Sequence, residues 1–161
     1  MTEQAAEHRS ITHMRQALRS LGATGEIRVL SDSARTAVEA AAALGCEPGA
    51  IASSLVFDAD GDPVLVVTSG AHRVDTALLS AEQHLPALRR ATADFVRTHT
   101  GQAIGGVAPV GHPAPLRTFV DRWLARHDTV WAAGGHPHAV FPTTYTELLA
   151  ITGGIPVDVE R

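Results

Sequence analysis

The amino-acid sequence predicts an α/β (α+β) fold in which helices surround a mixed, curved and partly barrel-like β-sheet. Strand patterns and helix patterns mix along the chain without the strict βαβ rhythm of a doubly wound parallel sheet. Two capping boxes, at Thr36 and Thr144, mark helix starts. With 161 residues, 45% hydrophobic and 19% charged, the chain has the size of one domain with one core. We expect a single domain over residues 1–161, with residues 1–25 as an N-terminal helical extension.

The first third of the chain is expected to form a helix, a short strand and a second helix. Apolar residues at helical spacing predict an amphipathic helix over 5–21, which Gly22 ends. Residues 27–30 are a short strand candidate. The capping box at Thr36 opens an alanine-rich helix that ends at Gly45, and we expect this helix to be short and mostly buried.

The middle of the chain predicts a β-hairpin followed by two helices. Residues 51–57 and 64–68 are β-rich runs on either side of a turn that contains Asp, Gly and Pro, which is typical of a hairpin. After the hairpin we expect a helix that Asp75 caps and that ends at about Gln83. A weak strand near Leu88 separates it from a second helix, which Thr92 caps and which ends at about Thr98.

The last third of the chain begins with an unusual loop. Residues 101–115 contain more glycines and prolines than an ordinary turn needs, so we expect a strained, shaped loop of the kind that often carries function. The elements expected after it are strands over 116–120 and 129–133 with a helical turn between them, a strand over 139–141, and a helix from Thr144 to Gly153.

Composition limits the classes of function. The formal charge of −4 and the pI of about 6.1 mean that any contact with nucleic acid must be local. All 13 basic residues are arginine. We expect a cytoplasmic protein without membrane contact, because no apolar run approaches the roughly 20 residues that cross a bilayer and the N-terminus is polar. The single cysteine, Cys46, excludes an internal disulfide. The sequence leaves open whether the protein is a monomer or a weak dimer.

Several common catalytic motifs are missing from the sequence. A Gly-x-Ser-x-Gly elbow, a P-loop and a Gly-x-Gly-x-x-Gly motif after a strand are absent, which argues against a common serine hydrolase, an NTPase and a dinucleotide enzyme. Of nine histidines, only His136 and His138 lie close together, and no third metal ligand can be identified. We therefore expect neither a metal nor a cofactor, and interpret these histidines as solvated or substrate-facing.

The segment from Gly105 and Gly106 to Pro109 is the main candidate for chemistry. The glycines permit backbone conformations that other residues avoid, and the proline stiffens the exit. Exposed N–H groups in such a loop can hold a carbonyl oxygen or an anion. A structural tight turn is the alternative interpretation.

Asp121 and the aromatic residues are also open to two interpretations. Asp121 can be a helix cap, which we favour, or a carboxylate of a site. Base stacking is conceivable for Trp123 and Trp131, but their apolar neighbours favour packing in the core. Four phenylalanines are likewise expected in the core: Phe57, Phe95, Phe119 and Phe141.

Short motifs along the chain occur in a characteristic order. They are Thr36-Ala-x-x-Ala-Ala, Leu44-Gly-Cys-Glu-Pro-Gly, Ile51-Ala-Ser-Ser-Leu-Val-Phe57, Gly70-Ala-His-Arg-Val-Asp75, Ala93-Asp94, Thr100-Gly101, Gly105-Gly106-Val-Ala-Pro-Val-Gly111 and Ala133-Gly-Gly135. In this order and spacing, the chain resembles the YbaK/EbsC family, whose members are related to the insertion (editing) domain of bacterial prolyl-tRNA synthetase. The resemblance covers residues 27–159.

The resemblance implies the editing-domain fold and a deacylase that acts in trans, without cofactor or protein nucleophile, on the acceptor end of a tRNA mischarged with a small amino acid. In relatives the loop that matches Gly105, Gly106 and Pro109 orients the aminoacyl carbonyl, while the 2′-hydroxyl of the terminal adenosine helps to activate or position water. His138 would line the pocket. Six further substrate-binding candidates are His136, Arg73, Asp94, Thr100, Gly101 and Gly134.

The chain departs from the family pattern at Ser53, where relatives usually have a lysine that helps to hold the tRNA end and supports catalysis. The chain has no lysine anywhere. Three interpretations are a deacylase with a different polar contact, which we favour, a weakened enzyme, or a binding protein without the chemistry. Ser53 could donate a hydrogen bond to the terminal phosphate or ribose. Arg73 could supply the missing charge, or pair with Asp75 or another surface carboxylate.

Overall fold

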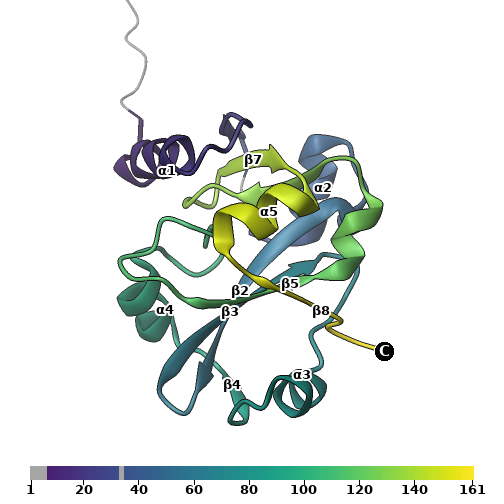
Figure 1. Ribbon diagram of the computed structural model, residues 1–161. Helices are drawn as coiled ribbons and strands as arrows, with labels where there is room; N and C mark the ends of the chain where they lie inside the picture. The colour runs from purple at the N-terminus through teal and green to yellow at the C-terminus, as the bar shows by residue number, and fades with distance from the viewer. Residues whose placement is uncertain (1–6, 33–34) are drawn as a thin grey trace, which may run out of the picture.

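The computed structural model describes residues 7–32 and 35–161, and it confirms the mixed α/β class (Figure 1). The helices are α1 (Arg9–Ser20), α2 (Ala37–Leu44), α3 (Thr76–Gln83), α4 (Ala93–Thr100) and α5 (Tyr145–Thr152), with 3-10 turns η1 (Pro48–Ala50) and η2 (Arg122–Arg126). The strands are β1 (Arg28–Val29), β2 (Ile51–Ala59), β3 (Asp62–Ser69), β4 (Leu88–Arg90), β5 (Arg117–Asp121), β6 (Val130–Ala133), β7 (Ala139–Thr143) and β8 (Ile155–Val157). None of the described helices is long and apolar enough to cross a membrane.

Local capping chemistry sets the helix boundaries, as the sequence predicts. The Thr36 box is complete, because its hydroxyl oxygen accepts from the Glu39 N–H while the Glu39 carboxylate accepts from the Thr36 N–H. At Thr144 only the first half forms: the Glu147 carboxylate instead accepts from the Thr143 hydroxyl at 2.6 Å. Asp75 and Thr92 also cap their helices, α3 and α4.

One mixed sheet holds the described strands, in the order β1-β7-β6-β2-β3-β5-β8, with β4 pairing with β2 outside that path. The hairpin β2–β3 is antiparallel and runs through the centre of the molecule, whereas β2–β6, β3–β5 and β5–β8 are parallel (Figure 1). On the outer edge of β2, β6 pairs only with residues 51–52 and β4 only with residues 57–59. In the described part of the chain, the sheet is therefore open on this edge over residues 53–56.

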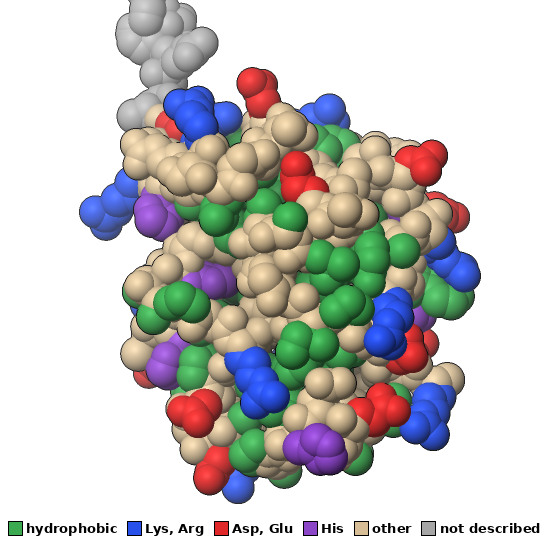
Figure 2. Space-filling model, in the orientation of Figure 1, with side chains coloured by type: hydrophobic (Ala, Val, Ile, Leu, Met, Phe, Trp, Pro, Cys, Tyr) green, Lys and Arg blue, Asp and Glu red, His purple; other side chains and the backbone are tan. Residues whose placement is uncertain are grey.

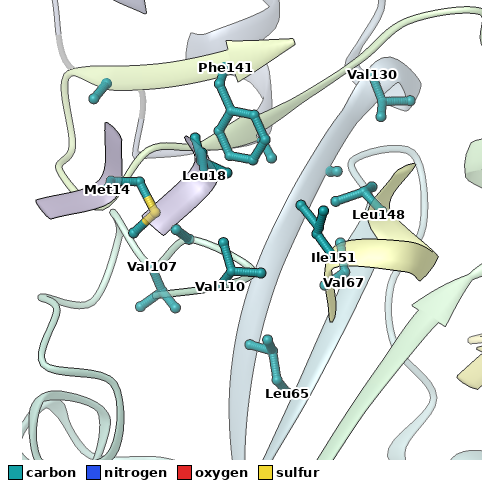
Figure 3. Close-up of a cluster of buried hydrophobic side chains, with 14 of the residues drawn as sticks. Met14, Leu18, Leu65, Val67, Val107, Val110, Val130, Phe141, Leu148 and Ile151 are labelled. Atoms are coloured by element: carbon teal, nitrogen blue, oxygen red, sulfur yellow. The ribbon is translucent and has the colours of Figure 1, made fainter. Parts of the chain in front are cut away.

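The N-terminal helix contributes to the main core. Met14 and Leu18 of α1 point toward Val107 and Val110 of the glycine-rich loop and toward Phe141 of β7 (Figure 3). Met14 is fully buried. Residues 1–6, which belong to the expected N-terminal extension and include the start of the expected helix over 5–21, lie outside the described residues.

Two expectations about burial, for helix α2 and for Trp123, are wrong. Helix α2 is not mostly buried, since only Ala40 and Ala41 are, and Val38 is 68% exposed. Trp123 is 38% exposed, with the Arg126 guanidinium 3.2 Å from its ring centroid. Three other aromatic residues expected in the core are only half-buried, whereas two are fully buried. The half-buried residues are Trp131, Phe57 and Phe95, and the fully buried ones are Phe119 and Phe141.

Strand β8 has no counterpart in the sequence prediction. It adds to β5 in parallel register, with Phe119 opposite Ile155. Only Val157 of its three residues is buried, and Pro156 lies at its centre. The short segment therefore lacks the apolar alternation by which strands are recognised.

Candidate functional site

A cavity of about 730 Å³ lies along β2, and a volume in this range is typical of ligand sites. Its walls come from the start of α2, residues 51–57 of β2, the end of β4, residues 131–133 of β6 and three residues of the glycine-rich loop, Ile104, Gly105 and Val107. Successive residues of a strand point to opposite faces of the sheet. An unbroken lining by residues 51–57 therefore means that the cavity reaches both faces, through the gap beside residues 53–56.

The glycine-rich loop has backbone N–H groups without acceptors at the wall of this cavity. The Gly106 N–H donates to the Ala103 carbonyl oxygen at 3.1 Å, and the Ala108 N–H donates to the Gln102 amide oxygen at 2.7 Å. Among the described residues, the N–H groups of Gly105 and Val107 have no acceptor, and these two residues line the cavity. Ile104 also lines the cavity and its N–H likewise has no acceptor in the described structure, so the donors available to a ligand carbonyl are on Ile104, Gly105 and Val107.

Gly106 and Pro109 are buried and shape the loop instead of facing the cavity. A Cβ added at Gly106 would lie 2.8 Å from the His136 carbonyl carbon and from the Pro137 nitrogen. Only a glycine permits this close approach of two backbone segments. The second backbone segment is the turn that contains His136 and Pro137. Gly134 stabilises this turn, because its N–H donates to the Ala139 carbonyl at 2.7 Å.

Gln102 braces the loop from inside, a role that the sequence analysis did not anticipate. Its buried amide accepts from the Ala108 N–H and donates to the Val110 carbonyl at 3.3 Å. Thr100 is buried beside it, and its hydroxyl accepts from the Gln102 N–H at 3.0 Å. Gly101 is the left-handed C-cap of α4. Thr100 and Gly101 thus hold the loop and do not line the cavity.

Helix α1 packs against both glycine segments, which are the glycine-rich loop at Gly111 and the turn at Gly135. The Met14 Cε lies 2.7 Å from where a Cβ on Gly111 would stand, and 3.2 Å from the equivalent position on Gly135. His13 Nε2 lies 3.0 Å from the Gly111 carbonyl oxygen. The conformation of the site therefore depends on a helix that contributes no residue to its lining.

The two clustered histidines lie next to the site and outside its lining. His138 Nδ1 is 3.1 Å from the Leu30 carbonyl, and the His138 N–H donates to His136 Nδ1. The His136 ring lies 4.7 Å from that of His8, centroid to centroid. Burial lowers the pKa of His136, and the charges of His8 and His138 lower it further. No three metal-binding side chains are grouped for an ion in the described part of the chain.

Two adjacent serines of β2 line the cavity from opposite faces of the strand. Ser53 is half-buried. The hydroxyl oxygen of Ser54 is buried and has no hydrogen-bond partner among the described residues. Burial of an unsatisfied hydroxyl costs about 1–3 kcal/mol, so a partner from a bound ligand would be favourable.

Among the described residues, arginine is the only charged residue type in the cavity lining. Arg35 and Arg90 contribute to it, and the described lining contains no carboxylate, histidine or cysteine. The Arg35 stem lies against the glycine-rich loop, with its Cγ 3.2 Å from where a Cβ on Gly105 would stand. Both signs of charge are scattered over the molecular face in Figure 2, without an extended basic patch. The charge of the described cavity lining is therefore positive, from Arg35 and Arg90.

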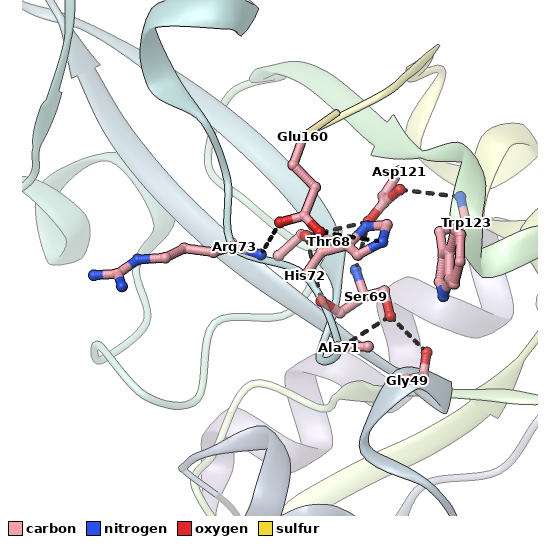
Figure 4. Close-up of polar contacts among 9 residues, drawn as sticks. All are labelled: Gly49, Thr68, Ser69, Ala71, His72, Arg73, Asp121, Trp123 and Glu160. Carbon is pink, nitrogen blue, oxygen red and sulfur yellow. Dashed lines mark hydrogen bonds and ion pairs between the residues drawn. The ribbon is translucent and has the colours of Figure 1, made fainter.

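Arg73 and Asp94 are placed away from the cavity. Arg73 is exposed, its backbone N–H donates to Glu160 at 3.0 Å, and its side chain extends away from the surrounding polar cluster (Figure 4). In the described structure Arg73 forms no ion pair with Asp75, which caps α3. Arg73 is also not one of the described residues that line the cavity. Asp94 is exposed in the first turn of α4.

Asp121 forms a separate buried polar cluster (Figure 4). It caps η2 by accepting from the Trp123 N–H at 3.0 Å, which confirms the cap interpretation. Its other oxygen accepts from the Ser69 N–H at 3.0 Å and lies 2.8 Å from His72 Nδ1. The Ser69 hydroxyl donates to the Gly49 carbonyl and not to His72. The cluster is therefore structural and lacks the geometry of a Ser-His-Asp triad.

The fold and the cavity define a small mixed α/β domain with a ligand cleft built on a gap in its sheet. Residues 31–151 match the family model of the aminoacyl-tRNA editing domain. A solved structure described as a candidate trans-editing enzyme for prolyl tRNA synthetase superposes with a TM-score of 0.90 at 41% identity, covering 97% of this chain and 99% of that chain. The chain belongs to the aminoacyl-tRNA editing domain family, which confirms the resemblance of the motifs.

Two relatives have a matching segment, one in a protein of similar length and one within a much longer chain. The uncharacterized protein YwhH of Bacillus subtilis is 31% identical over 124 residues, which cover 76% of this chain and 78% of YwhH. The proline–tRNA ligase of Nitratidesulfovibrio vulgaris is 31% identical over 108 residues, covering 67% of this chain. The match spans only 19% of that ligase.

Proposed function

We propose that this chain hydrolyses, in trans, the ester bond of a tRNA mischarged with a small amino acid. The observation that carries the proposal is the set of unpaired N–H groups on Ile104, Gly105 and Val107, at the wall of a cavity whose only charged residues, among those the structure describes, are arginines. Such a cavity suits a ligand with an ester carbonyl next to phosphates, as at the acceptor end of tRNA.

The chemistry requires few protein groups. Water attacks the ester carbonyl carbon, the bond from that carbon to the ribose oxygen breaks, and the products are the free amino acid and a tRNA with its terminal hydroxyl restored. The N–H groups of Gly105 and Val107 stabilise the negative charge that develops on the carbonyl oxygen. Loss of one such donor typically costs about 10²–10³ in rate.

Binding of the acceptor end is assigned to residues around the loop. We place Ser53 and Arg35 against the terminal ribose and phosphates, with Arg90 as a second cation at the β4 end of the cavity. Gly106, Pro109, Thr100 and Gly101 hold the glycine-rich loop in position, and Gly134 and His136 hold the neighbouring segment, whereas Arg73 and Asp94 have no part in the site. In this assignment the missing family lysine is replaced by an arginine from a different segment.

A deacylation panel tests the proposal. Purified protein is incubated, with chelator and without added metal, with tRNAs mischarged with alanine, serine or threonine, and release of the amino acid is measured. We expect turnover of at least one ester above the spontaneous rate. Absence of turnover over a broad panel contradicts the proposal, and binding of a non-hydrolysable aminoacyl-adenosine without any turnover would instead indicate a binding module.

A further inference from the structure

Ser54 lies where the sheet opens onto the cavity. In the register of the hairpin it faces Val67, which is fully buried, and it shares a face of β2 with Ala52 and Val56. Val107 of the glycine-rich loop belongs to the same buried cluster as Ala52 and Val67. The Ser54 hydroxyl is therefore surrounded by apolar side chains, on the side of the sheet from which the loop approaches.

The backbone around Ser54 is also turned toward the gap. The Ile51 carbonyl accepts from the Gly70 N–H at 2.8 Å, on the β3 side of the strand. Because backbone groups alternate in an antiparallel pair, Ser53 and Leu55 also bond toward β3, whereas the amide groups of Ser54 and Val56 face the open edge. This edge offers carbonyl acceptors suited to an amino group.

The Ser54 hydroxyl is the one buried side-chain group of the described cavity lining without a hydrogen-bond partner. Buried polar side chains almost always have a hydrogen-bond partner, and a hydroxyl can both donate and accept. With the ester carbonyl at Gly105 and Val107, the remaining parts of an aminoacyl group are its amino group and its side chain. The open edge accommodates the amino group, which leaves the Ser54 hydroxyl for the side chain.

We propose that Ser54 is a specificity-determining residue that selects aminoacyl groups with a small hydroxyl side chain, so that seryl and threonyl esters are preferred to alanyl esters. The inference rests on the proposed function and names its substrate class. A site built to hydrogen-bond a substrate hydroxyl discriminates against the analogue that lacks it, because its own polar group then stays unpaired.

The test compares kcat/KM for seryl-, threonyl- and alanyl-esters of the same tRNA in the native protein, Ser54→Ala and Ser53→Ala. We expect the native protein to prefer the seryl ester about tenfold. Ser54→Ala should reduce that preference to about twofold or less, with alanyl hydrolysis maintained and an unchanged or higher Tm. Ser53→Ala, the neighbour on the opposite face, should lower hydrolysis of all three esters alike and keep their ratio.

Two outcomes would overturn the inference: equal hydrolysis of seryl and alanyl esters by the native protein, or a Ser54→Ala variant that keeps the native ratio. If no ester is hydrolysed, the proposed function fails, and Ser54 is then judged by binding of 3′-amide-linked seryl- and alanyl-adenosine. Tighter binding of the seryl compound that disappears in Ser54→Ala supports the role of Ser54. Equal affinities contradict it.

Discussion

Gly106→Ala is the substitution that most directly probes the contact between the two glycine segments. The new Cβ would lie 2.8 Å from backbone atoms of His136 and Pro137, and an ordinary contact begins at 3.4 Å, so the segments must separate by about 0.6 Å. Overpacking of this kind costs about 1–3 kcal/mol, and each kcal/mol lowers Tm by about 2–4 °C in a chain of this size. A displacement approaching 1 Å can cost about 100-fold in rate. We therefore expect kcat/KM for deacylation to fall at least tenfold.

Thermal unfolding and deacylation well below Tm are measured together, with Gly154→Ala as the matched control. A Cβ at Gly154 would lie 2.8 Å from Val120 Cγ2, and neither glycine has a positive φ, so both variants introduce a collision without backbone strain. Gly154 lies outside the cavity lining. We expect the control to lose stability and keep activity. A folded Gly106→Ala protein with native activity would refute the reasoning.

Three further predictions concern the loop and the charges around it. Gln102→Ala leaves two buried loop groups without partners, so we expect a loss of about 1–3 kcal/mol in chemical denaturation together with slower deacylation; native stability would contradict the bracing role. Arg35→Gln should weaken tRNA binding and reduce the slope of log affinity against log salt by about 0.7. Arg89→Gln changes an exposed arginine outside the lining, so it should leave the affinity and the slope unchanged. Burial lowers the pKa of His112 below its usual 6.5, so the unfolded chain binds a proton at this residue more readily than the folded protein does. The free energy of unfolding should therefore keep its full value above about pH 6.5 and decline as the pH falls below it. Tm measured against pH should decline less steeply in His112→Gln than in the native protein, and identical profiles would exclude this histidine as the cause.

Features that depend on local chemistry could be predicted from the sequence. The caps at Thr36, Asp75 and Thr92 were identified because a cap needs only one side chain and the N–H groups within three residues of it. Strand β8 was missed because its place is set by pairing with β5, which is distant in sequence. Trp123 was expected in the core because its neighbours are apolar, yet it lies on the surface against Arg126.

The candidate site also has residues that the sequence predicts and residues that it does not. Gly105 was found because a run of glycines signals an unusual backbone. Arg35 and Ser54 were not found, because the cavity exists only where β4 and β6 stop short of each other along β2. How far two strands pair is decided by contacts across the whole sheet, which a single sequence does not display.

The role of α1 affects how a protein of this family should be divided into parts. The family match begins at residue 31, yet the Met14 side chain fills the space beside Gly111 and Gly135. The segment that the family model matches is therefore smaller than the segment that packs together here. A fragment that begins at residue 31 would keep every described residue that lines the cavity. It would lose the Met14 side chain, which packs against Gly111 and Gly135. A relative without such a helix must fill that space with atoms from elsewhere.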